Sequence, residues 1–204
     1  MTHVTHVTLV VPRGAEAAAV RRARTGTPVV EIAAGAQSVR LPAFADDMLP
    51  VVLGLCGSLG ELRVGDVALY RSVSDARGTF ACDERLAGAV RAHLVDACTT
   101  DHVVTTRDER TALVRRYRAD VVDMEGAHLA AAFAAQNRPF AMIRVVSDDP
   151  RRDLPALGTA IRADGRIDVL RVAYAFARAP LAAFAFVRDV RRALRVLTQL
   201  ARTL

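Results

Sequence analysis

Short apolar runs alternate with stretches of helical composition along most of the chain. Seven of these runs are rich in β-branched residues and predict strands, at residues 4–11, 28–32, 51–57, 67–73, 101–105, 120–124 and 140–146. Four stretches have the composition or apolar spacing of helices, at residues 16–24, 83–97, 108–117 and 125–136. This alternation predicts a three-layer α/β/α fold with a central mixed, largely parallel sheet.

The C-terminal part of the chain has a different pattern. Residues 169–204 are almost all helix formers, with Pro180 as the one break. Because no linker or repeat precedes them, we expect a single domain over residues 1–204, with residues 169–204 as a helical extension. This helix could pack on its own domain or on a partner subunit, or it could contact a membrane or an apolar ligand. Its apolar stripe recurs at steps of three and four and comprises Phe184, Val187, Val190, Leu194, Leu197 and Leu204.

The composition excludes several classes of protein. A hydrophobic fraction of 52% with 25% charged residues excludes general disorder. The net charge of +6 is carried by arginine alone and could indicate a nucleic-acid binder. The arginines are scattered among 22 acidic residues and no stacking aromatic lies among them, so we expect no nucleic-acid partner. Cys56, Cys82 and Cys98 are odd in number and lack metal-binding spacing, so neither a disulfide framework nor a metal site is expected.

The N-terminus favours a strand over a signal peptide, because it has no basic segment and no cleavage site. No apolar run is long enough to cross a bilayer. We therefore expect a cytoplasmic protein, which could also contact the inner face of the membrane through its C-terminal helix.

Acidic residues follow two of the predicted strands. Asp123 and Glu125 stand at the start of an alanine-rich helix, and Asp148 follows the strand at residues 140–146. Ligands of α/β proteins bind just beyond the carboxyl ends of the strands, so one cleft could hold both clusters. The alternative is that these acids only cap helices. A third feature is the glycine-rich stretch at residues 54–57, which is either a site of close ligand approach or an ordinary tight turn.

Three segments, in this order, resemble the superfamily of nucleoside phosphorylases and methylthioadenosine/adenosylhomocysteine nucleosidases. Residues 54–66 are similar to the family's glycine-rich strand end and its Val-Gly-Asp-Val strand. Residues 121–127 are similar to its Val-Glu-Met-Glu-Gly-Ala signature, and residues 139–148 to its Pro-Phe-x-x-Ile-Arg-x-Ile-Ser-Asp strand. The tail from residue 163 resembles the hopanoid-associated phosphorylases of bacteria, which are thought to remove adenine from adenosylhopane.

The resemblance implies that the chain cleaves the N-ribosidic bond of a purine nucleoside, through an oxocarbenium-like ribosyl cation. Asp148 would donate a proton towards purine N7, with its pKa raised for that task. Ser147 would orient Asp148, and the neighbouring Asp149 could help by like-charge repulsion. Glu125 would grip the ribose hydroxyls, and Met124 would pack against the sugar.

The resemblance also assigns the nucleophile's side of the site. Gly57 and the backbone near Cys56 would lie next to the nucleophile, and Glu16 would activate a water molecule. Two simpler interpretations stand beside these: Glu16 could be an ordinary exposed helix glutamate, and Cys56 a small buried packing residue.

The chain departs from the family in two places. The stretch before Gly54 is shorter than expected, and Leu55 and Cys56 replace the serine and alanine of the family, so a side-chain phosphate ligand is lost. Phosphorolysis and hydrolysis therefore both remain open, with no cofactor beyond inorganic phosphate as a co-substrate. Two rivals to the enzyme interpretation are a degenerate protein that binds a nucleoside without cleaving it and a membrane-associated scaffold. By analogy with the family we expect a homo-oligomer, acting on a free or a lipid-linked nucleoside.

Overall fold

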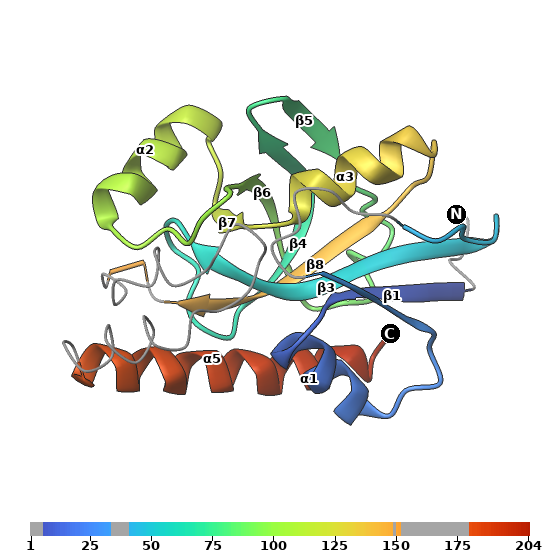
Figure 1. The fold of residues 1–204 in the computed structure, drawn as a ribbon, viewed down its shortest axis with the longest axis horizontal. Coiled ribbons are helices and arrows are strands. Elements are labelled where there is room, and N and C mark those ends of the chain that lie inside the picture. Colours follow the sequence, from blue (N-terminus) through green and yellow to red (C-terminus); the bar gives the residue numbers. More distant parts are fainter. Residues whose placement is uncertain (1–5, 34–40, 149, 152–179) are drawn as a thin grey trace.

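The structure is a computed structural model that describes residues 6–33, 41–148, 150–151 and 180–204. Figure 1 shows a central twisted sheet flanked by helices. The helices of this part of the chain are α1 (Ala15–Ala23), α2 (Arg107–Tyr117), α3 (Gly126–Ala135) and α5 (Pro180–Ala201). The strands are β1 (His6–Pro12), β2 (Val29–Ile32), β3 (Met48–Ser58), β4 (Val67–Asp75), β5 (Gly78–Ala81), β6 (His93–Thr99), β7 (Val121–Asp123) and β8 (Ala141–Asp148).

The long strand β3 lies at the centre of the sheet. It pairs in parallel with β1 and β8, and in antiparallel fashion with β7 near its carboxyl end. Strand β8 also pairs with β4 in antiparallel fashion, while β6 joins β4 and β7 in parallel. A closed ring is therefore formed by β3, β7, β6, β4 and β8. Strands β1 and β2 extend the sheet outside this ring, on the side of β3. The predicted mixed, largely parallel sheet is confirmed.

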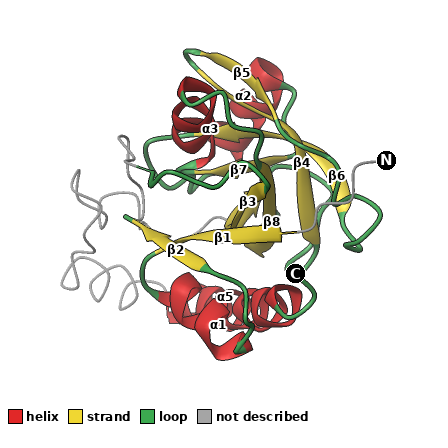
Figure 2. Cartoon of the chain, turned by 90° about the vertical axis from the view of Figure 1, so that its right-hand side faces the viewer, coloured by secondary structure: helices red, strands yellow, loops and turns green. Residues whose placement is uncertain are grey.

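The helices cover the two faces of the sheet. Helices α1 and α5 lie together on one face, while α2 and α3 lie on the other (Figures 1 and 2). One apolar core fills the space towards α1 and α5 and includes Leu53 and Leu197, and a second includes Met142 and Phe133. The predicted three-layer α/β/α architecture is confirmed.

Helix α5 docks on its own domain. It begins at Pro180, because proline fits the first turn of a helix, where no backbone N–H is needed. Towards its other end Leu197 is buried, and Thr198 donates a hydrogen bond from Oγ1 to the carbonyl oxygen of Ala19 in α1 at 3.0 Å. Phe184, which belongs to the predicted apolar stripe, is instead 72% exposed. None of the described helices is long and apolar enough to cross a membrane, and residues 169–179 lie outside the described range.

The prediction of a helix at residues 83–97 is wrong. Leu86 and Val90 are buried, as its apolar spacing required, but they belong to a series of turns. His93–Thr99 forms β6, which lies between β4 and β7 and satisfies the backbone groups of both. This tertiary pairing outweighs the local helical pattern.

One smaller prediction is also wrong, and one of two open interpretations is excluded. Residues 101–105 form a loop and not a strand, and Thr106 then caps α2 by accepting a hydrogen bond from Glu109 N at 3.3 Å. The glycine stretch at residues 54–57 is not a turn, because β3 stays extended as far as Ser58. The hairpin formed by β4 and β5 was not predicted.

Candidate active site

A cavity of about 300 Å³ lies at the carboxyl ends of β3, β7 and β8. The loop between β6 and α2 also lines it, as do Phe186 and Val190 of α5. The carboxyl ends of sheet strands are the usual place for such a site in α/β proteins. With the exception of Asp149, which lies outside the described residues, the cavity collects the residues to which a role was assigned from the sequence: Glu16, Cys56, Gly57, Met124, Glu125, Ser147 and Asp148.

The strand register places Asp148 against Gly57. Strands β3 and β8 run in parallel, and a shift in their register after Cys56 brings Gly57 opposite Asp148. A Cβ atom on Gly57 would lie 2.8 Å from Asp148 Oδ1, so glycine is needed for the carboxylate to approach the strand so closely. Ser147 donates a hydrogen bond from Oγ to the carbonyl oxygen of Cys56 at 3.1 Å, which ties the two strand ends together.

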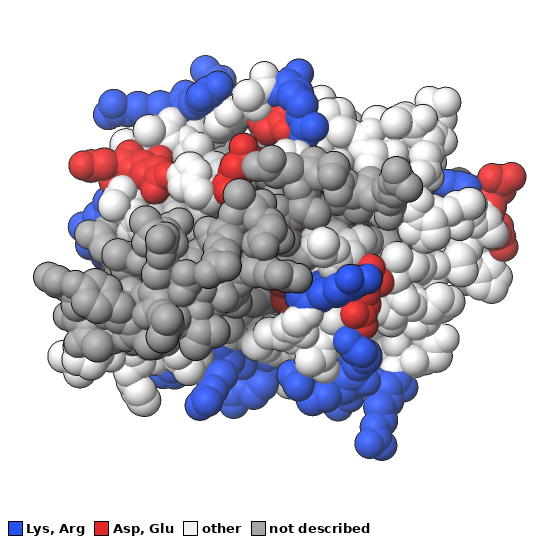
Figure 3. Space-filling view, viewed as in Figure 1, with Lys and Arg blue, Asp and Glu red and all other residues white. Residues whose placement is uncertain are grey.

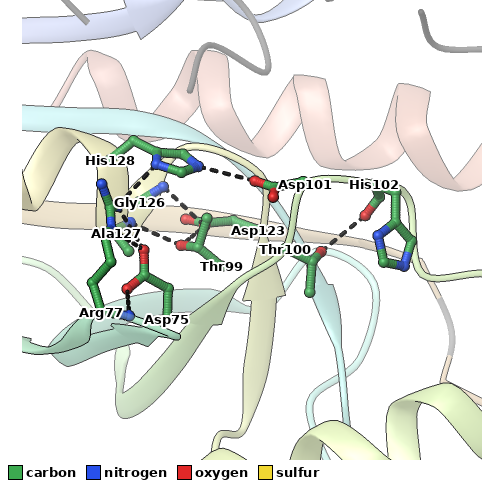
Figure 4. Close-up of polar contacts among 10 residues, drawn as sticks. All are labelled: Asp75, Arg77, Thr99, Thr100, Asp101, His102, Asp123, Gly126, Ala127 and His128. Carbon is green, nitrogen blue, oxygen red and sulfur yellow. Dashed lines mark hydrogen bonds and ion pairs between the residues drawn. The ribbon is translucent and has the colours of Figure 1, made fainter. Parts of the chain in front are cut away.

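The acids at the start of α3 have different surroundings. Figure 4 shows that Asp123 is the capping residue: its Oδ1 accepts hydrogen bonds from Gly126 N at 2.9 Å and from Thr99 Oγ1 at 2.7 Å. Its Oδ2 accepts a hydrogen bond from the hydroxyl of Tyr70 at 3.3 Å. Glu125 occupies the N-cap position but makes no side-chain cap hydrogen bond. The capping interpretation therefore fits Asp123, and the carboxylate of Glu125 lines the cavity.

A buried arginine that the sequence analysis did not single out lies beneath these carboxylates. Arg144, in the middle of β8, is fully buried. Its Nη2 lies 3.5 Å from Asp123 Oδ2, and its Nη1 lies 3.6 Å from Glu125 Oε2. Burial alone would lower the pKa of Arg144, but the carboxylates of Asp123 and Glu125 raise it above its ordinary value. A single arginine inside an otherwise apolar strand was the available signal, because such a charge needs buried acidic partners.

Glu16 enters the same site from α1. Its Oε1 accepts a hydrogen bond from Leu55 N at 2.7 Å, and it lines the cavity. Burial, reinforced by the negative charge of Glu125, raises the pKa of Glu16 to about 7. The glycine at position 54 makes this approach possible, because a Cβ atom there would lie 2.6 Å from Glu16 Oε1 and 2.3 Å from Arg144 Nη1. The interpretation of Glu16 as an ordinary exposed glutamate is therefore wrong.

Arg110, a second residue that the sequence analysis missed, holds Asp148. Its Nη2 donates a hydrogen bond to Asp148 Oδ2 at 2.9 Å, and both side chains are buried. Its Nη1 donates to the carbonyl oxygen of Pro150 at 3.2 Å. Asp149, whose like charge was expected to act on Asp148, lies outside the described range. No sequence pattern signalled Arg110, which is the one buried residue of α2.

Cys56 fits the packing interpretation. It is buried and belongs to the core that includes Phe133 and Met142. Burial raises the pKa of its thiol well above the ordinary value, so the thiol stays protonated and unreactive.

Comparison with known proteins identifies the family. The sequence matches the phosphorylase superfamily over residues 24–184, which is most of the chain. The chain belongs to the phosphorylase superfamily. Among curated proteins, none matches the sequence significantly. Membership of the superfamily confirms the enzyme class expected from the sequence, at the level of a nucleoside phosphorylase or nucleosidase.

Solved structures support the superfamily fold at low sequence identity. Native futalosine hydrolase of Helicobacter pylori is 12% identical with a TM-score of 0.64, and the match covers 99% of this chain and 98% of that one. The methylthioadenosine/adenosylhomocysteine nucleosidase of the same organism is 12% identical with a TM-score of 0.62. This match covers 100% of this chain and 100% of that one. The corresponding nucleosidase of Streptococcus pneumoniae, solved with 8-aminoadenine, is 17% identical with a TM-score of 0.61, with 98% of this chain and 100% of that one covered.

Proposed function

We propose that the chain hydrolyses the N-ribosidic bond of a purine nucleoside. The observation that carries this proposal is the convergence of Glu16, Glu125 and Asp148 on one cavity of about 300 Å³. The three carboxylates come from α1, the start of α3 and the end of β8, so each can face a different part of one ligand. Cleavage of this bond needs an acid at the base, a grip on the sugar and a nucleophile at C1′.

In the proposed reaction the bond between C1′ and N9 breaks as water attacks C1′. Asp148 delivers a proton to purine N7, so that the base leaves as a neutral molecule. Glu125 accepts hydrogen bonds from the ribose hydroxyls and stabilises the positive charge that develops on the sugar. Glu16 takes the proton from the attacking water. Its pKa of about 7 suits this task, because it is largely ionised just above neutral pH and still basic enough to accept a proton.

The charges that line the cavity favour water over phosphate as the nucleophile. The described lining residues include four carboxylates, those of Glu16, Asp123, Glu125 and Asp148, and no arginine. Arg144 and Arg110, which do not line the cavity, pair with three of these carboxylates, so the repulsion that a phosphate would meet comes chiefly from Glu16. Phosphorolysis is the second form of the same chemistry, with inorganic phosphate as co-substrate, and the experiment below separates the two.

For the substrate we propose an adenine nucleoside with an apolar group attached to the ribose, such as adenosylhopane in hopanoid biosynthesis. The resemblance of the tail to the hopanoid-associated phosphorylases supports this choice. So does the apolar part of the cavity lining, which includes Val103, Val122, Phe186 and Val190. Peripheral membrane contact and a homo-oligomeric state belong to the same proposal.

One observation favours the rival function, in which the protein binds a nucleoside without cleaving it. Asp148 Oδ2 already accepts a hydrogen bond from Arg110 and forms a buried ion pair with it. In the enzyme, the purine must therefore displace or weaken this contact. In a protein that only binds, the carboxylate would accept a hydrogen bond from the base.

The test is adenine release from methylthioadenosine and from a 5′-alkyl adenosine, each with and without phosphate. We expect release without phosphate, and a loss of about 10²- to 10⁴-fold in kcat for Asp148→Asn. Glu61→Gln is the control, because Glu61 is exposed on a loop and does not line the cavity. Release only with phosphate would establish phosphorolysis. Tight binding without any release, unchanged by Asp148→Asn, would refute the enzyme proposal.

A further inference from the structure

The outer face of α5 carries the largest exposed apolar side chains in the described part of the chain. Leu181 is 86% exposed and Phe184 is 72% exposed. Both lie in the N-terminal part of the helix, whereas the buried leucines Leu197 and Leu200 lie towards its other end. Two large apolar side chains this exposed and this close together on one helix indicate a surface that contacts something apolar.

Arginines surround this apolar face. A groove of about 740 Å³ runs between α5 and α1, and its apolar lining includes Ala183, Phe184, Val187 and Leu194. Four arginines line it as well, Arg22, Arg188, Arg191 and Arg195, and no acidic residue does. Figure 3 shows arginine side chains gathered along the lower edge of the molecule, where α5 and α1 lie in Figure 1.

Most of this positive charge is available to an external partner. Arg188 is neutralised by Asp189, whose Oδ1 lies 2.8 Å from its Nη2. Arg22, Arg191 and Arg195 make no ion pair with any residue that the structure describes. The groove therefore combines unneutralised guanidinium groups with apolar side chains, which matches a partner that carries phosphates next to hydrocarbon.

We propose that the groove between α1 and α5 docks the protein on an anionic phospholipid surface. Helix α5 would lie in the plane of the interface, with Leu181 and Phe184 entering the acyl region and Arg22, Arg191 and Arg195 on the phosphates. A nucleic acid would use the arginines but would gain nothing from Leu181, which makes lipid the better match. The inference rests on the peripheral membrane contact in the proposed function and deepens it, because it names the surface that makes this contact and the lipid that the surface binds; its residues on α5 are not those that line the cavity.

The docked orientation also has a bearing on the cavity. Phe186 and Val190 of the same helix line the cavity, while Phe184 and Val187 line the groove. A helix lying on the membrane would thus form the wall between the bilayer and the cavity. The enzyme would then work next to the phase in which a nucleoside with an apolar substituent dissolves.

The experiment is sedimentation of the full chain with vesicles of phosphatidylcholine alone or mixed with phosphatidylglycerol. Two variants test the groove: Arg191→Glu with Arg195→Glu, and Phe184→Ser. Their matched controls are Arg91→Glu with Arg115→Glu, and Val114→Ser, at exposed positions outside the groove. Circular dichroism and urea unfolding check that each variant folds.

We expect binding only to vesicles that contain phosphatidylglycerol, weakened at least tenfold by the double arginine variant and by raised salt, and unchanged in the controls. Phe184→Ser should weaken it several-fold. Three results would overturn the proposal: no binding to anionic vesicles, equal loss in the controls, or a Phe184→Ser variant that binds as the wild type does. The last result would indicate a general polyanion site, such as one for nucleic acid. Because binding is read without turnover, its outcome is independent of whether the proposed hydrolysis occurs.

Discussion

Glu16→Gln should make the protein more stable above neutral pH while abolishing the proposed activity. Burial and the charge of Glu125 raise the pKa of Glu16 from 4.5 to about 7. In the unfolded chain the same carboxyl group ionises near pH 4.5, so above that pH folding must either retain a proton or bury a charge. The free energy of unfolding of the wild type therefore falls as the pH rises. Glutamine cannot ionise, so the variant does not lose this stability.

The size of the effect follows from the two pKa values. Each tenfold change in proton affinity corresponds to about 1.4 kcal/mol, so the shift from 4.5 to about 7 corresponds to about 3 kcal/mol at high pH. The Glu16→Gln variant should not gain the whole of this free energy of unfolding. Glu16 also stabilises the charge of Arg144, and glutamine gives up that interaction while keeping an acceptor for Leu55 N. We expect a net gain of about 1 to 3 kcal/mol above pH 7.

The assay is urea unfolding of the wild type and the variant at pH 4.5, 7 and 8.5. The stability that the protonated carboxyl of Glu16 confers on the wild type is complete below pH 4.5 and is lost as the pH rises through about 7. The two proteins should therefore converge at pH 4.5 and separate above it, whereas Glu61→Gln should follow the wild type throughout. A difference that does not change with pH, or a variant less stable at pH 8.5, would refute the assignment of Glu16 to a desolvated site.

Three further predictions concern the same charge network. Gly54→Ala should lower adenine release at least tenfold, because its Cβ would lie 2.3 Å from Arg144 Nη1, whereas Gly60→Ala, with nothing within 4 Å, should be neutral in the same assay. Arg144→Met leaves the neighbouring carboxylates uncompensated and should cost about 3–5 kcal/mol in urea unfolding, so a variant as stable as the wild type would contradict its structural role. The rate of release should rise with pH through about 7 as Glu16 ionises, and a rate that falls over this range would exclude Glu16 as the base.

The elements whose pattern is set by local burial were predictable from the sequence. Strands β3 and β8 are buried on both faces and are mostly apolar, which is why they were predicted to within a few residues and Asp148 was placed at the carboxyl end of β8. Strand β6 was missed for the opposite reason. Its neighbours along the chain, Leu86 and Val90, are buried in turns at a spacing that imitates a helix, while Leu94 within the strand is 39% exposed. Only its pairing with β4 and β7 defines it as a strand.

The candidate site was predictable where residue type and strand end coincided, and not where charges meet across the fold. Glu125 and Asp148 were found because they follow strands and resemble family signatures. Arg110 contacts Asp148 from a helix 38 residues earlier, and nothing in its local sequence indicates that it turns inward. The sequence also did not indicate that Asp123 caps α3 while Glu125 lines the cavity. Asp123 is held by Thr99 and Tyr70, which come from other strands.

The place of α5 in the fold also bears on how the protein is made. Helix α5 (Pro180–Ala201) covers α1 (Ala15–Ala23), which lies more than 150 residues earlier, completes one apolar core and supplies Phe186 and Val190 to the cavity. A nascent chain can form the layer around α3 during synthesis, but α1 lacks its main packing partner until residues 180–204 leave the ribosome. We therefore expect that this face of the sheet is completed only after residues 180–204 have been synthesised, and that a chain truncated before residue 180 exposes the apolar face of α1 and becomes a target for proteolysis.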